Sequence, residues 1–199
     1  MSPKQHRGEV TYDLLLDAAL RLYADEGEQG LTVSAITRAS GVSLGSLYHH
    51  FGSIDGLVNA LLTRWLGRLL DELADAVRHS DDARTGVRSL VRAYLAFVQE
   101  HPDVSRLLHS SRADQVGMSG GKELRDVQEA RMPPLTTWAL RYVEQGELAA
   151  LPPALLESLL LGPVVGVSRR WLSVGDVDLE EAARILPERI WRSIGADGT

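Results

Sequence analysis

The fold is decided by residues 32–51, which read TVSAITRASGVSLGSLYHHF. The first nine place apolar side chains at helical spacing around Ile36, and Thr32 suits the N-cap of that helix. Gly41 then offers the left-handed backbone conformation that a sharp turn needs. Ser43 is a second N-cap, followed by a second helical stretch. The segment therefore predicts two short helices joined by a glycine turn, which is the helix-turn-helix unit.

This segment resembles the DNA-binding signature of TetR/AcrR-type transcriptional regulators, and the resemblance extends from Tyr12 to about Leu62. The remainder of the chain resembles the family only in length and helical texture. The matching positions are Ile36, Gly41-Val42-Ser43, Gly45, Leu47-Tyr48-His49-His50-Phe51, Ser53, Leu57 and Ala60.

The resemblance implies an all-α protein in two domains. Residues 1–52 form a helix-turn-helix DNA-binding domain with an N-terminal arm, and residues 53–199 form a helical ligand-binding and dimerisation domain. The second helix of the unit enters the major groove in such proteins. The residues expected at the DNA are Thr32, Ser43, Leu44, Gly45, Ser46, Tyr48, His49 and His50.

Two positions depart from the family pattern. Leu44 stands where a basic or polar residue is common, and Ile54 stands where a lysine often meets phosphate. Leu44 offers only apolar contact, for instance to a thymine methyl group. Both departures remove expected DNA affinity, and they leave open the bases that are read.

An enzymatic alternative arises because residues 41–45, GVSLG, fit the G-x-S-x-G pattern of a hydrolase nucleophile elbow. That motif needs a buried strand before the serine, whereas residues 32–40 have helical spacing. The six histidines include no H-E-x-x-H pair and no converging ligand set. We therefore expect no catalytic residues, no metal and no cofactor.

Composition is that of a globular protein, with 44% hydrophobic and 24% charged residues. Cysteine is absent, which fits a reducing compartment, and no apolar run suggests a signal peptide or a membrane span. We expect a cytoplasmic protein without a membrane partner.

The charge of the chain is unusual for a DNA-binding protein. The net charge is −6, residues 1–52 hold four Lys/Arg against six Asp/Glu, and no Lys or Arg occurs between Arg38 and Arg64. Phosphates would then be met by helix N-termini, hydroxyls, the two histidines and the arm residues Lys4 and Arg7. This predicts a shallow dependence of DNA affinity on salt.

Outside the signature, apolar periodicity predicts helices separated by Gly, Pro and polar breaks. Residues 1–8 are expected to be a mobile arm, and residues 115–121 a connection in preference to a lid. The consecutive prolines at 133 and 134 should divide one helical stretch. The expected helices are 11–26, 54–79, 86–100, 103–113, 122–146 with that division, 154–172 and 179–194.

Two further sites are predicted in the second domain. A largely apolar effector pocket is expected at Trp65, Tyr94, Leu107, His109, Arg112, Trp138 and Tyr142, although aromatic residues at helical spacing more often form core. The very apolar helix 154–172 and the last helix should form a four-helix dimer interface. Its expected residues are Leu156, Leu160, Pro163, Val164, Val167, Trp171, Ile190 and Trp191.

These observations favour a homodimeric transcriptional regulator, as a repressor that a small apolar or aromatic ligand releases from operator DNA. The serious alternative is a dimeric helical small-molecule-binding protein without operator binding, which would explain the missing cations.

Overall fold

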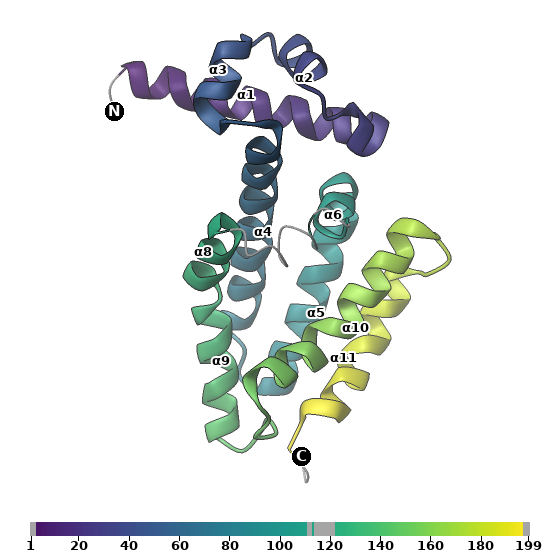
Figure 1. Cartoon of the computed structure of the whole chain (residues 1–199). Coiled ribbons are helices and arrows are strands. Elements are labelled where there is room, and N and C mark those ends of the chain that lie inside the picture. The colour runs from purple at the N-terminus through teal and green to yellow at the C-terminus, as the bar shows by residue number, and fades with distance from the viewer. Residues whose placement is uncertain (1–2, 111–112, 114–121, 197–199) are drawn as a thin grey trace. The chain divides into compact units, whose positions relative to one another are not determined.

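The computed structural model describes residues 3–110, 113 and 122–196, and these residues are almost entirely helical (Figure 1). The only extended pairing in the described part of the chain is an isolated bridge between Leu148 and Gly195. The all-α fold with an N-terminal helix-turn-helix is confirmed. The α-helices in the described part of the chain are α1 Pro3–Glu26, α2 Val33–Ser40, α3 Leu44–Phe51, α4 Ile54–Arg78, α5 Ala83–Glu100, α6 Pro102–Leu108, α8 Lys122–Arg131, α9 Pro133–Glu144, α10 Pro153–Ser173 and α11 Leu179–Ile194. A 3-10 turn, Gly27–Gly30, follows α1.

The N-terminal arm is the main departure from the predicted elements. Helix α1 begins at Pro3, so from residue 3 onward the expected mobile arm is helical and that prediction is wrong. Proline is favoured in the first turn of a helix, where its missing N–H is no loss. The polar residues that follow are good helix formers, and the Thr11 hydroxyl donates to the Arg7 carbonyl one turn back, at 2.9 Å. The predicted connection 115–121 lies outside the described residues.

The chain divides into two compact units. Unit 1 comprises Met1–Leu66 with Leu107–Asp126, and unit 2 comprises Gly67–Arg106 with Val127–Thr199. Helix α4 contributes residues to both, because the division falls after Leu66. The functional division after residue 52 stays a prediction.

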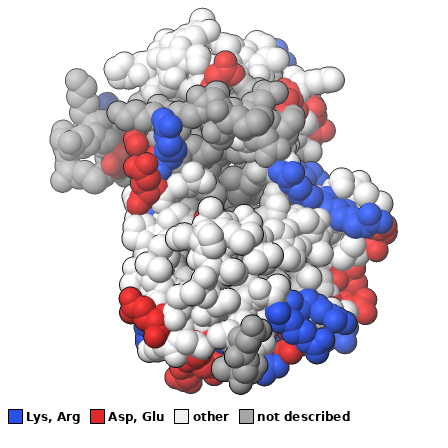
Figure 2. Space-filling view, turned by 60° about the horizontal axis from the view of Figure 1, so that its bottom comes forward, with Lys and Arg blue, Asp and Glu red and all other residues white. Residues whose placement is uncertain are grey.

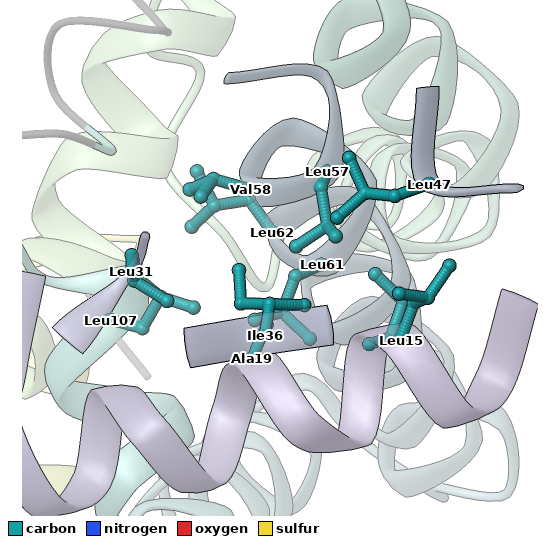
Figure 3. Packing of buried hydrophobic residues seen from close by; sticks show 11 residues of the cluster. Leu15, Ala19, Leu31, Ile36, Leu47, Leu57, Val58, Leu61, Leu62 and Leu107 are labelled. Carbon is teal, nitrogen blue, oxygen red and sulfur yellow. The ribbon is translucent and has the colours of Figure 1, made fainter. Parts of the chain in front are cut away.

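Unit 1 is held together by one apolar cluster, shown in Figure 3. Leu15 of α1, Ile36 of α2 and Leu47 of α3 are all fully buried in it. Leu57 and Leu61 of α4 close the cluster from another side. Each short helix therefore contributes its one apolar face, and tertiary packing stabilises helices that would be marginal alone.

In unit 2, α5 packs against α10 and α11, and α10 against α11 (Figure 1). Helix α9 is anchored separately at the turn between α4 and α5. There the Trp138 indole N–H donates to the Ser80 hydroxyl at 3.1 Å, and the Tyr142 hydroxyl donates to the Ser80 carbonyl at 2.8 Å. The Trp138 ring lies so close to Gly86 that a Cβ there would stand 2.4 Å from it.

The proline pair divides its helical stretch as predicted, because α8 ends at Arg131 and α9 begins at Pro133. None of the described helices is both long and apolar enough to cross a membrane. Charged side chains on the face in Figure 2 gather mainly around its edge, and the middle of that face carries few of them.

Candidate DNA-binding site

Two side-chain caps and one glycine fix the geometry of the helix-turn-helix. The Thr32 hydroxyl accepts from the Ala35 N–H at 3.3 Å at the start of α2. Gly41 ends that helix with φ of 70°, in the left-handed region. The Ser43 hydroxyl accepts from the Ser46 N–H at 3.2 Å and so begins α3. All three local predictions are confirmed. Hydroxyl side chains are favoured at N-caps, and glycine is favoured where a helix ends in the left-handed region.

The outer face of α3 carries most of the residues predicted to contact DNA. Leu44 and Tyr48 are 52% and 47% exposed, whereas Leu47 between them is fully buried. His49 is also exposed. Gly45 has open space where a Cβ would be, with no atom within 4 Å. A flat partner could therefore approach the backbone of α3 closely at this point, although the contacts themselves stay predictions.

His50 differs from its neighbours because its ring turns toward α1. It is half-buried and stands edge-on to Tyr12, with ring centroids 6.2 Å apart. Phe51 packs on the same tyrosine at 4.7 Å. The Arg64 guanidinium lies 5.4 Å above the Tyr12 ring and forms an ion pair with Asp13. This arrangement ties the end of α3 to α1 and α4, so His50 supports the recognition helix from behind.

Sequence reasoning missed the contact between Tyr12 and Arg64. Asp13 and Arg64 are 51 residues apart, and no local spacing indicates that they meet. The pairing also removes Arg64 from the cations available to phosphate. Besides Arg64, the arginines of α1 and α2, which are Arg7, Arg21 and Arg38, are exposed.

The nucleophile-elbow alternative lacks its structural context. A helix, α2, stands before Ser43 where the motif needs a strand, and the serine hydroxyl is occupied as a cap. Among the described residues, no group of three or more His, Asp or Glu could hold a metal ion.

The residues predicted for an effector pocket are not gathered in one unit. Trp65, Leu107 and His109 belong to unit 1, and Arg112 lies outside the described residues. Trp65 packs on the apolar cluster and Leu107 is part of it. Tyr94, Trp138 and Tyr142 belong to unit 2 and are buried there. Burial raises the pKa of Tyr94 to about 12, so its phenol stays neutral.

Unit 2 contains an apolar groove that sequence reasoning missed, with a volume of about 110 Å³. Trp138 is the only predicted pocket residue in its lining. Leu140 of this lining is 48% exposed and lies two residues from each of the buried aromatic residues Trp138 and Tyr142, so it faces away from them. The groove is lined by Leu90, Met132, Leu135, Thr136, Trp138, Ala139, Leu140, Val143, Leu151, Pro153, Leu156, Glu157, Leu160 and Leu161.

The predicted interface residues fall into two groups. Five are buried inside a single chain: Leu156, Leu160, Val164, Ile190 and Trp191. On α10, the buried residues Leu156, Leu160 and Val164 recur every four residues and so lie on one face of the helix. Helix α10 packs against α5 and α11 of the same chain. Pro163 is exposed, and Val167 and Trp171 are half-buried. The surface that a second subunit could reach on α10 also includes Leu155, which is 46% exposed.

Taken together, the described geometry defines a class: an all-helical protein with an N-terminal helix-turn-helix and a larger helical unit. Residues 15–61 match the model of the family described as bacterial regulatory proteins, tetR family. The match covers the helix-turn-helix, so this part of the chain resembles the DNA-binding domain of tetR-family regulators.

Known proteins with similar sequences support this placement. The chain is 34% identical to the HTH-type transcriptional regulator BetI of Rhizobium meliloti (strain 1021), over 53% of this chain and 61% of that protein. It is 36% identical to the HTH-type transcriptional repressor KstR2 of Rhodococcus jostii (strain RHA1), over 46% of this chain and 45% of that protein. The chain thus spans about half the length of the curated relatives it matches.

The fold is similar across nearly the whole chain to solved structures. One is the transcriptional regulator FadR from Bacillus subtilis in complex with stearoyl-CoA, with a TM-score of 0.77 and 15% identity. That similarity covers 90% of this chain and 97% of FadR. At this identity the similarity shows the fold, including that of the C-terminal unit.

Proposed function

We propose that the protein is a homodimeric transcriptional repressor that binds operator DNA through α3 and is released by a small apolar or aromatic ligand. The observation that carries the DNA-binding step is the outer face of α3, where Leu44, Tyr48 and His49 are exposed around a glycine with open space. Buried apolar side chains would be expected at these positions if the helix pair were only a packing unit.

Operator binding rests on hydroxyl and ring N–H donors more than on cations. Tyr48 and His49 can donate to phosphate oxygens, and Ser43 and Thr32 stand at helix N-termini, where backbone N–H groups favour anions. Two such heads in a symmetric dimer would read a pseudo-palindrome with half-sites about 34 Å apart. Dimerisation through α10 and α11 supplies the second head that a cation-poor module needs.

The effector site is the apolar groove of unit 2. Its volume of about 110 Å³ is somewhat below the roughly 150 Å³ of an apolar cavity that takes up benzene, so one ring or the end of an acyl chain would fit. Apart from Thr136 and Glu157 its lining is apolar, which favours a hydrophobic guest. FadR of Bacillus subtilis, a protein of similar fold, was crystallised with stearoyl-CoA, whose acyl chain is apolar.

A short path connects this groove to α4. Met132 lines the groove, and the preceding residue, Arg131, lies against α4. Its guanidinium is 3.4 Å from the Gly67 carbonyl oxygen and forms an ion pair with Asp71. Because α4 continues into unit 1, a guest that displaces Met132 would alter how Arg131 holds the helix on which the DNA-binding unit is built.

The first experiment is fluorescence anisotropy with DNA flanking the protein's own gene. Binding is measured at low salt with and without toluene, a neutral one-ring apolar probe. We expect saturable DNA binding that the probe weakens. Probe uptake without any DNA binding would instead support the alternative of a small-molecule-binding protein that lacks operator binding.

Two variants separate the effector site from the coupling path. Leu140→Gln should weaken probe binding, whereas Leu14→Gln, which changes a similarly exposed leucine of α1 outside the groove, should not. Arg131→Gln should leave DNA and probe binding intact and reduce the effect of one on the other. Arg68→Gln is its control, because it breaks another ion pair of α4, that with Glu72. Equal loss of coupling in both arginine variants would contradict the proposed path.

A further inference from the structure

A cleft with arginine walls lies between α5 and α11, apart from the apolar groove. Arg84, Arg88 and Arg92 follow one another at four-residue intervals on α5, and all three are exposed. Helix α11 faces them with Arg184 and Glu188. The cleft has a volume of about 160 Å³, and Ala183 and Pro187 complete its lining. It shares no residue with the apolar groove.

The charge in this cleft is strongly positive. Four arginines and one glutamate give 4 − 1 = +3, in a chain whose net charge is −6. Glu188 accepts from the Arg84 guanidinium at 2.6 Å, and Arg192 stands 3.7 Å from the same carboxylate. The hydrogen bond from Arg84, followed by the charges of the neighbouring arginines, holds the pKa of Glu188 below its ordinary value. Glu188 is therefore an ionised partner that is already engaged with Arg84.

The other arginines of the lining have no hydrogen-bonded carboxylate of this kind. No ion pair or side-chain hydrogen bond joins Arg88 or Arg92 to any residue in the described ranges. Arg184 makes only a 3.4 Å contact with the Glu180 carbonyl of its own helix. Arg88 also interacts electrostatically with Asp82, whose carboxylate is engaged in capping α5. Like charges one helical turn apart repel each other, so this face is unfavourable while the cleft is empty.

We propose that the cleft between α5 and α11 binds a small, multiply charged phosphate-type anion. Arg88, Arg92 and Arg184 would contact the anion, and Glu188 would position Arg84 beside it. Guanidinium groups suit this ligand because their planar forks bind phosphate oxygens in pairs. Three forks without a hydrogen-bonded carboxylate, placed around one concavity, favour a di- or triphosphate-sized group over a monovalent ion. An ordinary solvated arginine face would be convex and interspersed with acidic residues.

The test is isothermal titration of the full chain with sodium pyrophosphate at fixed ionic strength. We expect saturable binding that Arg88→Gln combined with Arg92→Gln weakens about tenfold or more. The matched control is Arg189→Gln, an exposed arginine of α11 that does not line the cleft. Circular dichroism and thermal melting establish that each variant is folded.

Three results would overturn the proposal. Binding that all three substitutions reduce equally would show only attraction to net positive charge. No saturable binding to the wild-type chain would leave the cleft without this ligand. No pyrophosphate binding, together with a changed sedimentation coefficient of the Arg88/Arg92 variant, would assign the arginine row to a contact between subunits. Because the experiment contains no DNA and no apolar probe, its outcome is independent of the proposed function.

Discussion

Two glycines of the helix-turn-helix should respond to alanine in opposite directions. Gly45 lies in α3 with an ordinary negative φ and open space around its Cβ position. Gly41 has φ of 70°, where a Cβ meets its own carbonyl. Replacing Gly45 by alanine removes the entropic cost of glycine in a helix, which is roughly 0.5–1 kcal/mol. Replacing Gly41 by alanine forces an L-residue into the left-handed region at a cost of roughly 1–2 kcal/mol.

The measurement is thermal unfolding followed by circular dichroism at 222 nm. For a chain of this length, about 1 kcal/mol shifts the midpoint by roughly 2–4 °C. We expect Gly45→Ala to raise the midpoint by a few degrees and Gly41→Ala to lower it by a similar or larger amount. A rise in both variants would refute the turn geometry, and a fall in both would refute the open space at residue 45.

Two substitutions at Gly45, to alanine and to leucine, also test the DNA-binding face. A methyl group at residue 45 projects into the space that a DNA groove would occupy, and leucine there would project further. Gly45→Leu should therefore weaken DNA binding more than Gly45→Ala while both remain folded. If DNA affinity were unchanged in Gly45→Leu, α3 would not approach DNA on this side, whatever the stability of the variant.

Three further predictions concern salt, pH and packing. The slope of log DNA affinity against log salt concentration should correspond to no more than about six counterions per dimer, because the helix-turn-helix module offers few cations to phosphate. A steeper slope would contradict the interpretation that DNA is contacted through few cations. The Thr85 N–H, at 2.6 Å, lowers the pKa of the Asp82 cap, so its contribution to stability is complete above about pH 4 and is lost as the pH falls through the lowered value. In urea titrations Asp82→Ala should cost about 1 kcal/mol at pH 7, and Asp82→Asn should keep the cap but lose this pH dependence. Gly86→Ala should lower the free energy of unfolding in urea by roughly 1–3 kcal/mol, because the new Cβ would lie 2.4 Å from the Trp138 ring. An unchanged urea midpoint would show that α9 can shift without a loss of stability.

The parts of the fold that sequence predicts best are those fixed by neighbouring residues. Thr32, Gly41 and Ser43 act through backbone groups within four residues, so their chemistry determines their position. Helix α11 has the predicted bounds, Leu179–Ile194, for the same reason. Asp178 caps it through the N–H groups of residues 180 and 181. Local rules failed at α1, because polar residues of good helix propensity carry no apolar pattern to reveal them.

What the sequence could not predict depends on which faces meet. Apolar spacing on α10 predicted a face for a second subunit, but Leu156, Leu160 and Val164 face the interior of their own unit. Spacing shows that a stripe exists and does not show what covers it. The apolar groove escaped prediction in the same way, since its walls come from helices that are distant in sequence. Trp138 was predicted for an effector pocket and lines this groove, but its hydrogen bond to Ser80 also makes it a structural anchor, and its role toward a ligand stays a prediction.

The free energy needed to release DNA determines how large a change the proposed effector would have to make at the groove. Moving a two-state protein from 1:99 to 99:1 requires a differential binding free energy of about 5.5 kcal/mol. Shared between two subunits, this is about 2.7 kcal/mol per ligand, equivalent to roughly 110 Å² of apolar surface buried in one state and exposed in the other. One leucine or methionine side chain at the groove covers a comparable area. Release therefore does not require the groove to open and close as a whole; displacement of Met132, next to the arginine that holds α4, would be sufficient.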